Sequence, residues 1–178
     1  MARYFAFLRA INVGGHTVKM DVLRLLFEEL GFTNVETFIA SGNVVFDAKP
    51  SKLLEARIER HLATKLGYEV ATFVRTRTEL AAILKHEPFP ADEIANAHAL
   101  WVGFMASPHA GDTAGITAAL RTEFDEFHFH DRELFWMLRR KMTESGVSLP
   151  AMQRQLKCPV TFRTARTLER MLAKYPGA

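Results

Sequence analysis

The sequence predicts an α+β protein made of two ferredoxin-like (βαββαβ-type) subdomains packed together, with extra C-terminal helices. Two observations lead to this fold class. The first half of the chain shows strand, helix, strand, strand, helix and strand patterns in that order, and the second half begins a similar order. The stretches "YFAFL" and "LFWML" are apolar at every position, so we expect both sheets to be covered on both faces.

The spacing of apolar residues predicts each element of the first half. Residues 4–10 read as a strand, and residues 20–30 have apolar side chains at helical spacing. "VETFIA" and "NVVFDA" predict two strands joined by a Ser-Gly turn. Residues 51–67 predict a helix that begins after Ser51 and ends at Gly67, and "YEVATFVR" predicts the last strand.

A short connecting helix, "TRTELAAIL", follows the last strand of the first half, and the second half begins with a strand, "AHALWVGFM". "DTAGITAALRTEF" predicts a helix, and "EFHFHDRELFWMLRR" predicts two strands around a turn at Asp131 and Arg132. Two helical patterns, "LPAMQRQL" and "RTLERMLAKY", complete the chain. We find no sequence-level repeat between the halves, so their symmetry is one of pattern alone.

These patterns predict the domain boundaries. Residues 1–86 form the first subdomain with a connecting helix, residues 87–96 form a linker with two prolines, and residues 97–178 form the second subdomain with basic C-terminal helices.

Composition limits the class of protein. The chain has 178 residues, of which 48% are hydrophobic, so it can bury a sizeable core. No apolar run approaches the roughly 20 residues of a membrane helix, and the N-terminus lacks a signal-peptide pattern. The single cysteine excludes an internal disulfide. We therefore expect a cytoplasmic protein without a membrane association, and its oligomeric state stays open.

Positive charge is concentrated near the C-terminus. Residues 132–178 hold 10 basic and 3 acidic side chains, whereas residues 1–131 hold 13 and 17. A basic segment on a mildly acidic body favours an anionic partner, such as phosphate, nucleotide or nucleic acid. The alternative is a solvated helical face rich in arginine.

Two polar loops are expected to meet in the first subdomain. The first two strands run parallel in this topology, so the loops "INVGG" and "SGN" that follow them emerge at the same edge of the sheet. Paired glycines permit positive φ, and the helix that starts near Lys19 offers unpaired N–H groups. The loop matches neither phosphate-binding fingerprint, G-x-x-x-x-G-K-[ST] or G-x-G-x-x-G. Simple turn chemistry is the alternative.

The motifs together resemble the DUF1697 family of bacterial proteins. They are "LRAINVGG", "VKM", "SGNVVF", "VRT", the Pro88-Phe89 pair and the T-x-R-x-x-x-T pattern that begins at Thr161. The resemblance covers nearly the whole chain and implies two ferredoxin-like subdomains and no established activity. This chain departs from the family pattern at five positions: Ala10 stands for Gly, Ala40 for Gln, and Thr164, Ala165 and Arg166 for Asn, Trp and Asn.

From these loops and the last helix we predict a site for a small anionic ligand that carries phosphate or carboxylate. Its expected residues are Arg9, Asn12, Gly14, Gly15, Ser41, Gly42, Asn43, Arg163 and Thr167. For Arg163 and Thr167 the alternative is a helix cap with an arginine that contacts a neighbouring loop. No cofactor and no catalytic group are assigned, so enzyme activity stays open. Two other functions are kept: nucleic-acid binding through the basic segment, and a structural or protein-interaction role without a ligand.

The stretch "EFHFH" raises the question of a metal. It places Glu126, His128 and His130 on one face of a strand, with Phe127 and Phe129 on the other. Neighbouring side chains on one strand splay apart, and the sequence alone places no further Cys or His beside them. We therefore predict an exposed polar face and no metal site.

Overall fold

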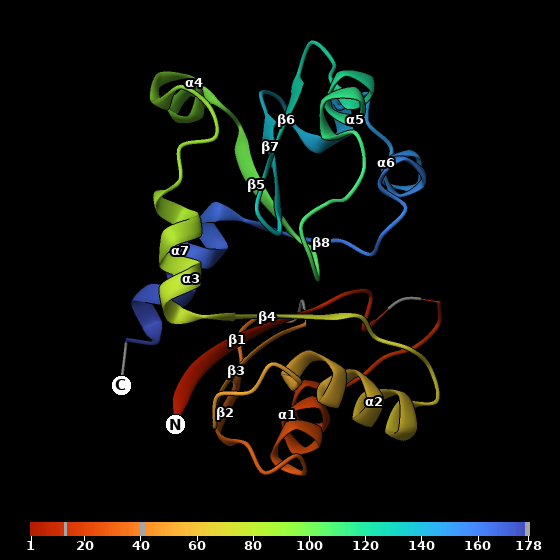
Figure 1. Ribbon diagram of the computed structural model, residues 1–178, viewed down its shortest axis with the longest axis vertical. Helices are drawn as coiled ribbons and strands as arrows, with labels where there is room; N and C mark the ends of the chain where they lie inside the picture. The colour runs from red at the N-terminus through yellow and green to blue at the C-terminus, as the bar shows by residue number, and fades with distance from the viewer. Residues whose placement is uncertain (13, 40–41, 177–178) are drawn as a thin grey trace. The chain divides into compact units, whose positions relative to one another are not determined.

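The computed structural model describes residues 1–12, 14–39 and 42–176 of the chain. The chain divides into two compact units. The first comprises residues 1–81 and the chain end from Lys174, and the second comprises residues 82–173. Each unit contains one four-stranded antiparallel sheet (Figure 1). Within the described ranges, no helix has the length and apolar character needed to cross a membrane.

The first unit has the predicted βαββαβ order and is a ferredoxin-like subdomain. Its strands lie in the order β2-β3-β1-β4, and every neighbouring pair is antiparallel. Helix α3 (Arg77–Lys85) begins directly after the last strand and crosses the boundary between the units. The elements are β1 (Ala2–Leu8), α1 (Met20–Glu28), β2 (Thr33–Thr37), β3 (Asn43–Ala48), α2 (Leu54–Leu66) and β4 (Thr72–Thr76).

The second unit repeats this topology with the strand order β6-β7-β5-β8. The sequence patterns assigned no element to the stretch between the last two helices, but the four-residue strand β8 lies there and completes the sheet. Part of the expected linker forms helix α4. The elements are α4 (Ala91–Asn96), β5 (Ala99–Phe104), α5 (Thr113–Leu120), β6 (Asp125–His130), β7 (Glu133–Leu138), the short 3₁₀ helix η1 (Met142–Glu144), α6 (Leu149–Leu156), β8 (Thr161–Thr164) and α7 (Ala165–Lys174).

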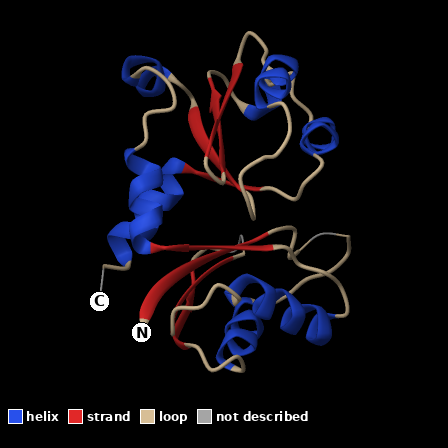
Figure 2. Cartoon of the chain, in the orientation of Figure 1, coloured by secondary structure: helices blue, strands red, loops and turns tan. Residues whose placement is uncertain are grey.

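Helices α1 and α2 cover one face of the first sheet (Figure 2). Leu23 and Phe27 of α1 and Ile58 of α2 are fully buried against strand residues such as Phe46. Each large apolar side chain buried in this way contributes about 1.5–3 kcal/mol. The opposite face of β1 is also buried: Phe5 has no exposed surface, which confirms the prediction of two covered faces for this strand.

The core of the second unit is built around Trp136 of β7, which is fully buried. Its indole ring stacks on Phe127 at 5.5 Å, and its Nε1 donates a hydrogen bond of 2.9 Å to the carboxylate of Asp125. Asp125 is also fully buried, and it accepts a second hydrogen bond of 2.8 Å from the Ser145 hydroxyl. The buried carboxylate is therefore well satisfied, as a buried charge must be.

The two units share a local sequence pattern that was not recognised from the sequence. Arg75-Thr76 ends β4 and Arg163-Thr164 ends β8, and a helix follows at once in both cases. Both arginines are buried, and the threonine hydroxyl accepts a hydrogen bond of 3.2 Å from the backbone N–H three residues later. Each threonine is thus the N-cap of its helix.

An ion pair links two neighbouring strands of the first unit. Arg3 of β1 lies opposite Asp47 of β3, and its guanidinium donates two hydrogen bonds of 2.9 and 3.0 Å to the two carboxylate oxygens. The Asn34 side chain donates a third, of 2.8 Å. These hydrogen bonds, led by the one from Arg3, lower the pKa of Asp47.

We expect this pair to make stability depend on pH. An Asp with a lowered folded pKa stabilises the fold above its unfolded pKa of about 3.9, and this contribution is lost as the pH falls through the folded pKa. Asp47→Asn should therefore reduce the free energy of unfolding by about 1 kcal/mol at pH 7, with a difference that closes below about pH 4. Urea denaturation followed by circular dichroism measures this, with the exposed Glu69→Gln as control. A difference that stays constant from pH 7 to pH 3 would contradict the assignment.

Candidate functional site

The end of β1 and the β2–β3 hairpin meet at Gly42. The backbone N–H of Leu8 donates to Gly42 O at 2.8 Å, and Phe38 N–H donates to Asn43 O at 3.0 Å. Gly42 has a φ of 73°, and a β-carbon there would lie 3.1 Å from Ile11 Cγ2 and 3.2 Å from Leu8 O. The described parts of "INVGG" and "SGN" are therefore in contact, as the topology predicts. Ala40 and Ser41 lie outside the described residues.

Both asparagines of this corner have hydrogen bonds within the chain. Asn12 Oδ1 accepts a hydrogen bond of 2.7 Å from Val18 N–H, which closes the loop from residue 9 to residue 19. Asn43 is fully buried, and its side-chain nitrogen donates to Phe38 O at 3.0 Å. These side chains set the shape of the corner, and we call its first part, residues 9–19, the 9–19 loop.

The 9–19 loop presents a basic outer surface. Gly14 and Gly15 are exposed and have φ values of 66° and 83°. His16 and Lys19 are exposed, Arg9 is half-buried, and the loop contains no acidic residue. An anion that approached these glycines would meet backbone and cationic groups without a competing carboxylate in the loop.

Tyr68 holds the loop through two contacts, and the sequence did not predict either of them. The hydroxyl of Tyr68 donates a hydrogen bond of 3.0 Å to Ile11 O. The His16 ring stacks on the Tyr68 ring at 4.0 Å. Burial raises the pKa of Tyr68, so its hydroxyl keeps the proton that it donates. No sequence spacing links residue 68 to this loop, because α2 separates them.

Arg163 and Thr167 belong to the second unit, and their contacts there are structural. Arg163 is buried, and its Nη1 donates to the Thr161 hydroxyl at 2.9 Å and to Phe162 O at 2.8 Å. Desolvation lowers the pKa of Arg163 to about 10, so it stays charged at neutral pH. The Thr167 hydroxyl is 2.9 Å from that of Thr164, the residue that caps α7. Ala165 is half-buried and Arg166 is exposed.

The basic C-terminal segment is less available for an anionic partner than its net charge indicates. Besides the buried Arg163, several of its cations are engaged in ion pairs. These pairs join Arg139 to Glu93 and Glu126, Arg140 to Glu144, and Lys174 to Glu36.

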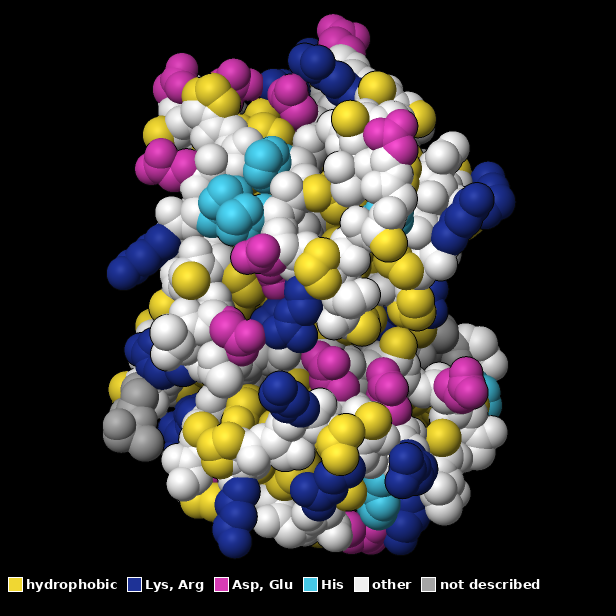
Figure 3. Space-filling view, viewed as in Figure 1, with side chains coloured by type: hydrophobic (Ala, Val, Ile, Leu, Met, Phe, Trp, Pro, Cys, Tyr) yellow, Lys and Arg dark blue, Asp and Glu magenta, His cyan; other side chains and the backbone are white. Residues whose placement is uncertain are grey.

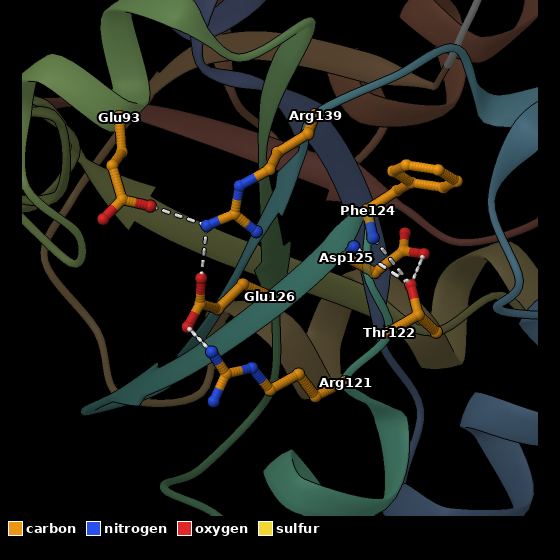
Figure 4. Close-up of polar contacts among 7 residues, drawn as sticks. All are labelled: Glu93, Arg121, Thr122, Phe124, Asp125, Glu126 and Arg139. Atoms are coloured by element: carbon orange, nitrogen blue, oxygen red, sulfur yellow. Dashed lines mark hydrogen bonds and ion pairs between the residues drawn. The ribbon is translucent and has the colours of Figure 1, made fainter.

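Glu126 does not join the histidines of its own strand. Its carboxylate accepts a hydrogen bond of 2.7 Å from Arg139 and lies 3.3 Å from an Arg121 nitrogen (Figure 4). Arg139 also donates to Glu93 at 2.6 Å, and these two hydrogen bonds, chiefly that to Glu126, raise its pKa. The carboxylate therefore belongs to an ion-pair network at the start of β6.

His86, from outside the strand, lies beside His128 and His130, and Glu126 does not. His86, His128 and His130 each place one ring nitrogen within 4.8 Å of the corresponding nitrogens of the other two. Histidine side chains gather on the face of the second unit seen in Figure 3. His86 directly follows α3, and no spacing rule relates it to "EFHFH", which begins 40 residues later.

Comparisons with known proteins identify a family and a fold. The model of a family described as "Protein of unknown function (DUF1697)" matches residues 1–135. No curated protein matches the chain. The structure of the conserved bacterial protein SP0830 from Streptococcus pneumoniae superposes with a TM-score of 0.74 at 24% identity, and the alignment covers 98% of each chain. At this identity the likeness establishes the fold alone.

Gly42 is expected to be far less tolerant of a side chain than Gly15. Alanine costs about 1 kcal/mol at either left-handed position, and at Gly42 it also meets Ile11 and the Leu8 carbonyl. Gly42→Ala should therefore destabilise by about 2–3 kcal/mol in total. Gly15→Ala is the matched control, because a β-carbon there meets nothing within 4 Å. Urea denaturation by circular dichroism would contradict this account if the two variants lost equal stability.

Ala10 has a φ of 55°, in the region that glycine favours. Ala10→Gly should relieve about 1 kcal/mol of backbone strain and lose part of that gain to the greater freedom of the unfolded chain. We expect a net stabilisation of about 0.5 kcal/mol. Ala63→Gly, inside helix α2, should instead cost about 1 kcal/mol. Both values come from the same denaturation experiment, and equal losses would show that Ala10 is unstrained.

Proposed function

Since the chain belongs to the DUF1697 family of proteins of unknown function, we propose its function from its own geometry: the first unit binds a small anionic ligand at the 9–19 loop. The ligand carries phosphate or carboxylate. One observation carries the proposal: an exposed glycine pair lies in a loop that has three basic residues, no acidic residue, and its shape fixed from within.

The fixed shape matters because it lowers the entropy lost on binding. Asn12 closes the loop through Val18, Tyr68 supports Ile11, and Gly42 lets the hairpin approach. A ligand that meets a loop already ordered in this way loses less affinity to ordering than one that must organise a mobile segment.

The chemistry of the loop favours an anion over a neutral ligand. Glycines let the backbone of a turn approach an anion closely, and turns that present successive N–H groups on one concave side bind anions. Arg9 supplies a planar guanidinium that suits phosphate and carboxylate oxygens. We assign direct contact to Arg9, Gly14 and Gly15, and positioning roles to Asn12, Gly42 and Asn43.

Calorimetric titration with inorganic phosphate, pyrophosphate and small carboxylates tests the proposal. Arg9→Gln should weaken the tightest of these about tenfold or more, because a charge-assisted hydrogen bond contributes roughly 1.5–3 kcal/mol. Lys52→Gln, which removes an exposed cation ahead of α2, should leave the affinity unchanged. No saturable binding by the wild type, or equal weakening in the two variants, would refute the site.

Two further arms separate the alternatives. Thr167→Ala tests whether the start of α7 contributes to the ligand, as the sequence predicted; an unchanged affinity limits the site to the first unit. A single-stranded oligonucleotide titrated at low and high salt tests the basic segment, since backbone binding weakens steeply with added salt. Tight, salt-sensitive oligonucleotide binding that survives Arg9→Gln would favour that segment over the 9–19 loop.

A further inference from the structure

We propose that His86, His128 and His130 form a binding site for a divalent transition-metal ion of the zinc class. The three residues lie in the second unit, so this site is separate from the 9–19 loop and does not depend on the anion proposal. Each contributes one ring nitrogen, and these three nitrogens lie within 4.8 Å of one another.

The fold explains why these rings meet. His128 and His130 are two residues apart on β6 and share one face of the sheet, while Phe127 on the other face belongs to the core. On the neighbouring strand β7, Phe135 lies opposite His128. Its ring centroid is 5.3 Å from that of His86. The hydrogen bond from His86 N–H to Ala82 O, 3.0 Å long, holds the backbone of His86 at the end of α3.

Protein contacts leave one of these rings unsatisfied. His86 Nε2 is buried and has no hydrogen-bond partner among the residues that the structure describes. An unsatisfied buried polar nitrogen is energetically unfavourable, and a metal ion would supply the missing partner.

The ligand set selects the class of ion. Three imidazoles without a carboxylate or thiolate suit zinc, copper, nickel and cobalt, and they do not suit calcium or magnesium. The Glu126 carboxylate is held by Arg121 and Arg139 and is not among the ligands. Three histidines leave at least one coordination position for water or a small ligand.

Metal binding requires one ring to move. The His86 and His130 rings stack in parallel at 3.8 Å, with 13° between their planes, so their lone pairs do not converge on one point. His130 has 46% of its side chain exposed and can rotate out of the stack, whereas His86 and His128 are half-buried. We therefore expect the ion to bind with a reorientation of His130.

An apolar cavity adjoins the site through His86. It has a volume of about 230 Å³ and is lined by apolar side chains that include Leu100, Val102 and Phe135, with Glu87 and Glu169 as its acidic groups. Because His86 lines both the cavity and the metal cluster, a small organic molecule in the cavity would lie next to a metal ligand.

Titration of the untagged protein with Co²⁺ tests the proposal, with visible absorption as the readout and Zn²⁺ as competitor. We expect one equivalent per chain, with the intense d–d bands of a nitrogen-rich, four-coordinate ion. His86→Gln, His128→Gln and His130→Gln should each weaken binding about 100-fold, since even the loss of an outer-shell partner costs 10–100-fold. His98→Gln, at an exposed histidine of the same unit, is the matched control and should change nothing.

A second measurement covers the case in which a variant fails to fold. Zn²⁺ added to the wild type should protect His86, His128 and His130 from carbethoxylation, as mapped by mass spectrometry, and should leave His98 reactive. It should also raise the thermal midpoint by about 5 °C when the ion is in large excess over its dissociation constant. Absence of Co²⁺ bands, equal protection of all histidines, or unchanged affinity in His86→Gln would each overturn the proposal.

Discussion

Complete enclosure of strand β1 is the constraint on which the first unit depends. Its residues from Tyr4 to Leu8 are all buried, and the strand is hydrogen-bonded to β3 on one side and to β4 on the other. A strand with both faces and both edges occupied cannot slip in register without exposing its apolar side chains. The point at which the chain leaves the sheet is therefore fixed. The described residues of the 9–19 loop begin from that fixed position, and the hydrogen bonds of Asn12 and Tyr68 then hold them.

The fold was predictable because it rests on periodicity, which local sequence records. Helix spacing and apolar strands gave the order of elements, and the topology alone brought "INVGG" beside "SGN". Strand β8 was missed because it has only four residues, two of them threonines and one an arginine. So short and polar a stretch shows no clear alternation of apolar and polar residues. The repeated Arg-Thr pair was missed for a related reason, since two matched residues become meaningful only when both are seen between a strand and a helix.

The candidate sites were less predictable because they depend on where side chains end. The sequence correctly placed His128 and His130 on one strand face. It did not show that Glu126 forms ion pairs with Arg121 and Arg139, from outside the strand. His86 enters from the end of a helix, which no spacing rule relates to β6. Likewise, the residue type of Asn43 suited ligand binding, but its side-chain nitrogen donates a hydrogen bond to Phe38 O within the turn. Residue type and strand position predict which side chains lie near one another. Whether a side chain is available to a ligand depends on its hydrogen-bond partners, which the sequence does not show.

The placement of Trp136 in the core of the second unit has a practical consequence for spectroscopy. Both tryptophans of the chain, Trp101 and Trp136, lie in the second unit, while all three tyrosines lie in the first. Fluorescence excited selectively through indole therefore follows the second unit alone, and the near-ultraviolet absorbance of the tyrosines follows the first. The chain thus contains an independent optical reporter in each half, and without any labelling the two signals distinguish cooperative unfolding from stepwise unfolding.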